Sequence, residues 1–350
     1  MTRFSFAMLP DYPVGECIEM IKTADRLGFY AAYSADETWH KDMWLIFAAA
    51  ADKTTNIRFG PNVTHVILKE PTILAQQLAT LDELTNGRAE AVVSFGNLGM
   101  LQQYGIDWST QKPLARLREG MHVMRTFLDE GAITFDGEFF NYSGLFTFAR
   151  PVQEHLPLKL GGMGGPKSFE MAGEIADGLH HALGYSKDNY EYIAKHMRIG
   201  AEKAGRSYED LDFGAWICWA CAEDGEAAKR AAKIMVAFYL SSMPESLMNR
   251  HGYSRADFDP IMEALGKGEI DKAIEMTSDD IAETLSVAGT PEECAEKLNR
   301  DMIGVGVNHI IAAITDSGLV KTFSGKDIEG VPDVQGQLEL IADRVMPNLK

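Results

Sequence analysis

Short apolar runs typical of buried strands alternate with helical patterns along almost the whole chain, and this alternation limits the possible folds more than any other feature. The runs expected to form the main sheet are 3–8, 30–34, 57–61, 89–95, 158–161, 178–182, 211–221 and 307–314. Amphipathic patterns between them predict helices, such as 14–27, which ends at Gly28. Strands that alternate with helices form a parallel sheet with helical cover, because each parallel crossover needs a long connection.

Eight strand–helix units in a chain of 350 residues favour an α/β fold of the closed TIM (β/α)8 type over an open doubly wound sheet, which remains the alternative. A β-hairpin over 133–142, turning at Asp136-Gly137, is expected to interrupt the pattern. An insertion of short helices is expected over about 244–286. No low-complexity linker divides the sequence, so we expect one domain over residues 1–350.

The charge balance excludes one class of partner. Lys and Arg number 33 against 51 Asp and Glu, a net charge of −18, whereas a nucleic-acid-binding protein needs a basic surface. A small phosphorylated substrate or cofactor is still compatible, because a helix N-terminus can hold an anion. The longest apolar stretches, 44–51 and 215–222, are shorter than the roughly 20 residues of a membrane span. With no signal-peptide pattern, we expect a cytoplasmic protein with no membrane partner.

The four cysteines do not predict a metal site. Cys218 and Cys221 form a CxxC pair, but no second pair of cysteines or histidines follows at zinc-ligand spacing. Because the pair lies within an apolar run, we interpret it as part of a core strand.

Polar residues follow several predicted strands, where a TIM barrel carries its active site. Asp36 and Glu37 follow the second strand and could supply acid–base groups. His65 follows the third strand, where a lone histidine is more often structural. The pair His180-His181 lies within a strand, so one ring should face the barrel interior and the other the helices.

A glycine-rich stretch over 160–178, LGGMGGPKSFEMAGEIADG, is the most informative motif. Glycines directly after a strand allow the backbone to approach a ligand closely, and the helix expected from Pro166 offers free N–H groups and a positive dipole end. Lys167 would add a positive charge. The segment therefore predicts a phosphate cradle, with an unspecific flexible turn as the alternative.

Five segments together resemble the bacterial-luciferase-like superfamily, and within it the coenzyme F420-dependent methylenetetrahydromethanopterin reductases. They are FGPNVTHVILKEPTILAQQLATLDELTNGRAE (59–90), MAGEIADG (171–178), GAEKAGR (200–206), NRHG (249–252) and AGTPEEC (288–294). The resemblance implies a TIM barrel that binds a deazaflavin, or in other branches FMN, at the strand ends. It also implies a non-prolyl cis peptide at Asn62-Val63, phosphate contacts from 161–167, and a homodimer or higher homo-oligomer.

Three positions depart from the family pattern as we know it. Glu37 stands where related enzymes often have His, Ala7 or a neighbour replaces a Glu, and Asn97 replaces an acidic residue. The resemblance therefore supports the cofactor, F420, more firmly than the pterin substrate. It implies hydride transfer to a small organic acceptor, with an FMN-dependent monooxygenase or a non-catalytic flavin-binding barrel as alternatives. The residues assigned on this basis are Asp36, Glu37 and His65 for catalysis, and Asn62, Val63, Thr64, Asn97, Gly161, Gly162, Gly164, Gly165 and Lys167 for cofactor binding.

Overall fold

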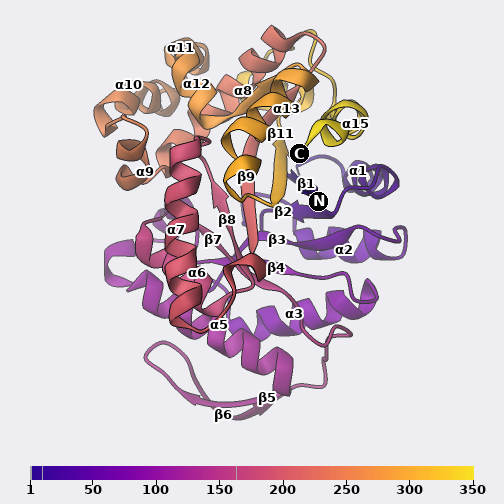
Figure 1. The fold of residues 1–350 in the computed structure, drawn as a ribbon, viewed down its shortest axis with the longest axis vertical. Helices are drawn as coiled ribbons and strands as arrows, with labels where there is room; N and C mark the ends of the chain where they lie inside the picture. Colours follow the sequence, from indigo (N-terminus) through magenta and orange to yellow (C-terminus); the bar gives the residue numbers. More distant parts are fainter. Residues whose placement is uncertain (1, 10, 163) are drawn as a thin grey trace.

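Eight parallel strands close into a barrel at the centre of the molecule (Figure 1). The computed structural model describes residues 2–9, 11–162 and 164–350. The barrel strands are β1 (Arg3–Met8), β2 (Ala31–Ser34), β3 (Arg58–His65), β4 (Ala91–Ser94), β7 (Leu158–Gly162), β8 (Gly178–Ala182), β9 (Asp212–Cys221) and β11 (His309–Ile314). They pair in the order β9-β11-β1-β2-β3-β4-β7-β8, and β8 pairs with β9 to close the ring. The TIM-barrel fold expected from the sequence is confirmed.

Helices cover the outside of the barrel. They are α1 (Val14–Arg26), α2 (Met43–Ala51), α3 (Pro71–Leu84), α4 (Leu98–Gln103), α5 (Pro113–Glu130), α6 (Pro166–Ile175), α7 (Lys187–Lys203), α8 (Gly225–Tyr239), α9 (Glu245–Arg250), α10 (Arg255–Gly266), α11 (Ile270–Met276), α12 (Asp279–Leu285), α13 (Pro291–Asp301), α14 (Ser317–Ser324) and α15 (Val334–Leu340). Of these, α9 to α12 lie within the predicted insertion and gather at one end of the molecule (Figure 1). No helix of the described residues is long and apolar enough to cross a membrane.

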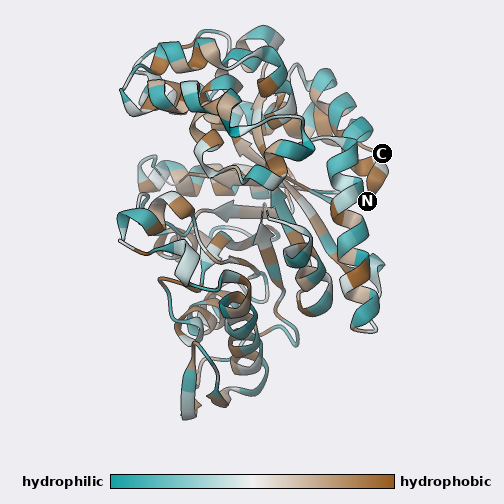
Figure 2. Cartoon of the chain, turned by 90° about the vertical axis from the view of Figure 1, so that its left-hand side faces the viewer, coloured by the Kyte–Doolittle hydropathy of each residue, from teal (hydrophilic) through white to brown (hydrophobic). Residues whose placement is uncertain are grey.

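The two faces of the barrel strands differ in character. Outward side chains such as Phe4, Phe59 and Trp219 pack under the helices in one large apolar cluster. Figure 2 shows hydrophobic residues on the strands and hydrophilic ones along the outer helix surfaces. The inward side chains near the N-terminal ends are instead polar and buried: Ser5, Tyr33, Glu90, Lys159, Asp212 and His309. Every residue of β9, including Cys218 and Cys221, is buried, as expected for a core strand.

Strand β3 continues further than the sequence predicts. The sequence predicts a strand that ends at Pro61. The observed strand passes through Pro61 to His65, with an irregularity in its register against β4 between Asn62 and Thr64. The end of β3 therefore reaches into the region where the site was expected.

The hairpin is present, but its turn is longer than expected. Strands β5 (Ala132–Asp136) and β6 (Asn141–Phe146) are joined by four residues rather than by a tight turn at Asp136-Gly137. The Glu119 carboxylate accepts the backbone N–H groups of Glu138 and Phe139, each at 2.9 Å. This anchor on α5 holds the wider loop against the helix, a long-range contact that turn propensities do not include. A short strand, β10 (Val287–Gly289), also pairs with β9 outside the barrel.

Candidate functional site

A cavity of about 670 Å³ opens at the C-terminal ends of the barrel strands. Its walls are mainly apolar and include Trp108, Trp216 and Tyr239, which were not predicted from the sequence to lie there. The lining includes nine of the residues assigned from sequence: Glu37, Asn62, Val63, Asn97, Gly161, Gly162, Gly164, Gly165 and Lys167. An apolar cavity with a few convergent polar groups is the usual form of a small-molecule site.

Asp36, Thr64 and His65 lie behind this lining and do not form part of it. The Asp36 carboxylate is buried and accepts hydrogen bonds from Thr64 Oγ1 at 2.7 Å and Trp44 Nε1 at 3.1 Å. Lys69 pairs with its other oxygen. The Asp36 backbone N–H also donates to the Val63 carbonyl at 3.2 Å. With its oxygens engaged in this way, Asp36 holds the end of β3 in place.

Val63 reaches the cavity through an irregular segment of β3. The Asn62-Val63 peptide bond is cis, as the resemblance implied. Val63 then packs against the end of β7, where a Cβ on Gly161 would collide with its Cγ1 atom. The glycine at 161 is therefore required by this close approach, and Asn62 and Val63 together form part of the cavity wall.

Glu37 is the only carboxylate among the described residues of the cavity lining. Burial raises the pKa of Glu37 above its usual value, although His40 and the Asn97 amide partly oppose this effect. His40 Nε2 lies 3.9 Å from a Glu37 oxygen, and the Asn97 oxygen caps α4 by accepting the Gly99 N–H at 2.9 Å. A raised pKa makes the protonated form of the carboxyl group more available at a given pH, so Glu37 could donate a proton to a ligand.

The glycine-rich segment forms a cradle at the start of α6. The N-cap of α6 is Gly165, which provides no side-chain cap, and the first turn contains no acidic residue. A Cβ placed on Gly165 would meet nothing within 4 Å, so the backbone there borders open space. The helix dipole and Lys167 both favour an anion at this position. Met163, between the cradle glycines, lies outside the described residues.

His180 lines the cavity from β8 and links it to the polar interior of the barrel. Its Nδ1 atom lies 3.0 Å from Asn62 Nδ2, and its Nε2 atom lies 3.6 Å from Asp212 Oδ1. Burial, and then the Lys159 charge, lower the pKa of His180 to about 4, so the ring is neutral at physiological pH. As expected, His180 faces the barrel interior, whereas His181 contacts α7 through Asn189.

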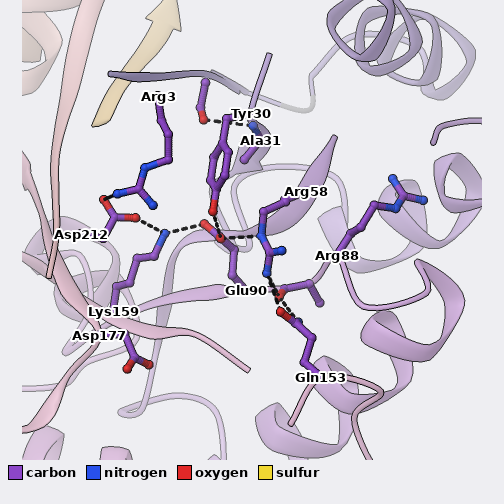
Figure 3. Close-up of polar contacts among 12 residues, drawn as sticks. Arg3, Tyr30, Ala31, Arg58, Arg88, Glu90, Gln153, Lys159, Asp177 and Asp212 are labelled. Atoms are coloured by element: carbon purple, nitrogen blue, oxygen red, sulfur yellow. Dashed lines mark hydrogen bonds and ion pairs between the residues drawn. The ribbon is translucent and has the colours of Figure 1, made fainter. Parts of the chain in front are cut away.

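A buried ionic cluster around Lys159 was not predicted from the sequence (Figure 3). Lys159 Nζ lies 2.6 Å from Glu90 Oε1 and 2.5 Å from Asp212 Oδ2. Arg58 pairs with Glu90 at 2.8 Å and Arg3 with Asp212 at 3.2 Å. Burial alone would raise the pKa values of both carboxyl groups, but the cations, Lys159 first, hold them well below their usual range. The sequence signal that could have indicated this cluster is the presence of charged residues within otherwise apolar strands.

One part of this cluster has the geometry of a metal site. Potential ligand atoms of His180, Asp212 and His309 lie within 4.8 Å of one another. However, Lys159 and Arg3 already neutralise the Asp212 carboxylate. A divalent cation would add charge to a cluster in which cations already outnumber carboxylates, so the chemistry of the cluster disfavours a metal.

A TIM barrel with a large apolar cavity at its strand ends and an anion cradle beside a helix N-terminus is the architecture of an enzyme that binds an organic molecule. Comparison with known families identifies the group. The luciferase-like monooxygenase family matches residues 2–309, and the chain belongs to this family.

Relatives match the chain along its whole length. The 5,10-methylenetetrahydromethanopterin reductase of Archaeoglobus fulgidus is 27% identical over 352 residues, which cover 99% of this chain and 100% of that protein. The enzyme of the same name from Methanopyrus kandleri is 28% identical over 360 residues, which cover 99% of this chain and 98% of that protein. The structure of the coenzyme F420-dependent tetrahydromethanopterin reductase from M. kandleri superimposes with a TM-score of 0.88 at 26% identity, covering 100% and 99% of the two chains. The chain is an enzyme of the oxidoreductase class.

Two solved structures that are less than 25% identical to this chain are similar to it in fold. An F420-dependent secondary alcohol dehydrogenase gives a TM-score of 0.80 at 21% identity, covering 100% of this chain and 99% of that one. A TM-score of 0.69 at 18% identity, with the same coverage, is found for the oxygenating component of 3,6-diketocamphane monooxygenase from Pseudomonas putida in complex with FMN.

Proposed function

We propose that this protein is an F420-dependent oxidoreductase that transfers a hydride between the deazaflavin and a small organic acceptor. The observation that carries the proposal is the full-length match to the F420-dependent reductase, at 26% identity and a TM-score of 0.88. The finer proposal for the acceptor is the methylene group of a reduced pterin-type one-carbon carrier, which rests on the names of the relatives.

The described residues fit such a cofactor. The cavity of about 670 Å³ is mainly apolar, as a planar ring system requires. Gly162, Gly164 and Gly165 keep the cradle free of side chains, and Lys167 stands beside it for a phosphate. When bound, the deazaflavin supplies the hydride-carrying centre.

The chain's own residues would position the reactants and manage one proton. Asn62 and Val63 would support one face of the ring, held by Asp36 and Thr64 from behind. Glu37 would hold a proton and exchange it with the acceptor, because burial raises its pKa. Asn97 would orient Glu37 and contact the ligand. We assign His65 a supporting role, since it is buried behind the lining.

Parallel binding titrations of the full chain with F420 and FMN test the proposal. Tight binding of F420 with little affinity for FMN supports it, and oxidation of reduced F420 by a methylene-bearing pterin would support the finer form. Preference for FMN, with oxygen consumption when FMN is reduced, would favour the monooxygenase alternative. Binding without turnover across a broad acceptor panel would favour a non-catalytic barrel. Sedimentation of the same sample tests the homodimer or higher homo-oligomer that the resemblance implies.

A further inference from the structure

The last carbonyl of β7, at Gly162, is held by a side chain from the next strand. Gly162 pairs with His181 at the end of the β7–β8 ladder. The His181 ring turns back so that Nδ1 lies 2.9 Å from the Gly162 oxygen. Because Gly162 lies at the start of the anion cradle, this contact holds the beginning of the cradle in place.

His181 is itself held by Asn189 on α7. Asn189 Nδ2 lies 3.1 Å from His181 Nε2 and 2.8 Å from the Gly184 oxygen. The Asn189 oxygen accepts a hydrogen bond from Arg250 Nε at 2.9 Å. His181 and Asn189 are fully buried, so each of these polar contacts replaces one with water.

Arg250 and the Gly162 carbonyl are the two ends of this series, and together they determine which atom donates in each of its hydrogen bonds. The Arg250 N–H can only donate, so Asn189 must direct its oxygen to Arg250 and its amide hydrogens to His181 and Gly184. His181 must then accept at Nε2 and donate from Nδ1 to the Gly162 carbonyl. Burial lowers the pKa of His181 to about 3, which keeps the ring in the neutral form that this arrangement needs.

Arg250 belongs to the helical insertion and to the NRHG segment, for which the proposed chemistry gives no role. It ends α9, and its guanidinium carbon lies 4.9 Å from the Tyr192 ring centre. Among the described residues, no carboxylate lies within ion-pair distance of Arg250. Its Nη2 atom is buried without a hydrogen-bond partner. The residue is thus placed for its Nε–H contact and its ring contact rather than for a salt bridge.

We propose that the insertion fixes the anion cradle through the series Arg250, Asn189, His181 and Gly162, and that the three side chains are positioning residues for the anionic group of the ligand. The choice of F420 as that ligand rests on the function proposed above. The series itself requires only that an anion bind at the cradle.

Two matched substitutions at Arg250 test the series. Arg250→Gln keeps an N–H at the atom position of Nε, whereas Arg250→Met places a methyl group there; both remove the guanidinium from Tyr192. Amide hydrogen exchange of the ligand-free chain, read on peptides covering 161–168, should accelerate about tenfold in Arg250→Met, the effect of one lost hydrogen bond. The exchange rate of these peptides in Arg250→Gln should stay close to that in the unaltered chain. Peptides from β1 should exchange at the unaltered rate in both variants.

Binding gives the second readout. Titration with F420, and with FMN, should show about a tenfold weaker affinity for Arg250→Met and near-normal affinity for Arg250→Gln. Equal losses in both variants, or no change in Arg250→Met, would overturn the proposal. If the unaltered chain binds neither compound, the proposed function fails, while the exchange experiment still decides the role of the series.

A substitution at Asn189 provides an independent check if Arg250→Met does not fold. A carboxylate cannot donate to His181, so Asn189→Asp should make the ring take up a proton and still donate to Gly162. The histidine NMR signal should then titrate at a much higher pH than in the unaltered chain, with the exchange of 161–168 preserved. An unchanged titration would overturn the assignment of donors.

Discussion

Asn62 and His180 determine each other's orientation across the cavity floor, with Asn62 Nδ2 3.0 Å from His180 Nδ1. Asp212 Oδ1 lies 3.6 Å from His180 Nε2 on the other side of the ring, beyond hydrogen-bond distance, and its negative charge favours the ring proton on Nε2. Nδ1 must then accept from the Asn62 amide. The Asn62 oxygen and its second N–H remain for a ligand. Asp212, which is buried and outside the cavity lining, therefore influences which hydrogen-bonding groups of Asn62 face the cavity.

The neutral state of His180 makes stability depend on pH. Its pKa is about 4 in the folded chain against 6.5 for an ordinary histidine. As the pH falls from 6.5 towards 4, the unfolded chain takes up a proton that the folded chain excludes, so stability is lost in this window and is fully present above it. His180→Asn should flatten this part of the curve. Urea unfolding of both proteins between pH 7 and 4 measures how the free energy of unfolding depends on pH. If the two proteins lose stability in parallel over this range, the prediction is wrong.

Lys159 is the central cation of the ionic cluster, and its loss should destabilise the fold. Lys159→Met would leave Glu90 and Asp212 with less compensation inside the barrel. Removing one partner of a buried ion pair typically lowers the free energy of unfolding by about 3–5 kcal/mol.

The matched control is Lys321→Met, because Lys321 pairs with Asp327 on the surface. There the loss should be under about 1 kcal/mol. Chemical denaturation of both variants separates the two cases. Similar losses of unfolding free energy in the two variants would show that burial does not make the ion pairs of Lys159 more important for stability.

The barrel could be predicted because its evidence is local and repeated. Each strand and helix carries its own periodicity, and strands such as 3–8 and 178–182 have the bounds expected from sequence. The strand through Pro61 was predicted too short, since its continuation depends on the contacts of Asp36 and Gly161 with residues 63 and 64.

The site was predictable only in part for a similar reason. Topology brings strand ends together, so it could place Glu37, Asn97 and the cradle glycines at the cavity, whereas their roles stay predictions. Whether a residue beyond a strand faces the cavity or the layer behind it depends on packing, and this separates Glu37 from Asp36. The cluster around Lys159 joins residues far apart in the sequence, and no local pattern connects them.

Glu37→Gln should remove the proton-transfer step without changing the shape of the cavity. We expect turnover with reduced F420 and a competent acceptor to fall about 100-fold or more. If Glu37 acts as an acid, the rate of the unaltered enzyme falls as the pH rises through its raised pKa, because the proton is then lost. The variant should lack this dependence.

The control for this experiment is Glu37→Asp, which keeps an ionisable carboxyl group and should keep a pH-dependent rate. A pH profile of Glu37→Gln that matches that of the unaltered enzyme would rule out the proton-transfer role. The measurement is the initial rate over the full pH range at saturating cofactor.

Gly161 and Val63 offer a test of the cavity wall. Gly161→Ala would bring a methyl group into collision with Val63 Cγ1, and Val92 Cγ1 would lie 3.1 Å away. Overpacking of this kind displaces the neighbouring side chain, so F420 affinity should fall about tenfold. Val63→Ala in the same chain removes the colliding atom and should restore much of the affinity. Gly15→Ala, whose added carbon would meet nothing within 4 Å, should bind normally. If the double variant binds no better than Gly161→Ala, the contact between these two residues does not shape the site, and the requirement for glycine at 161 must come from the ligand itself.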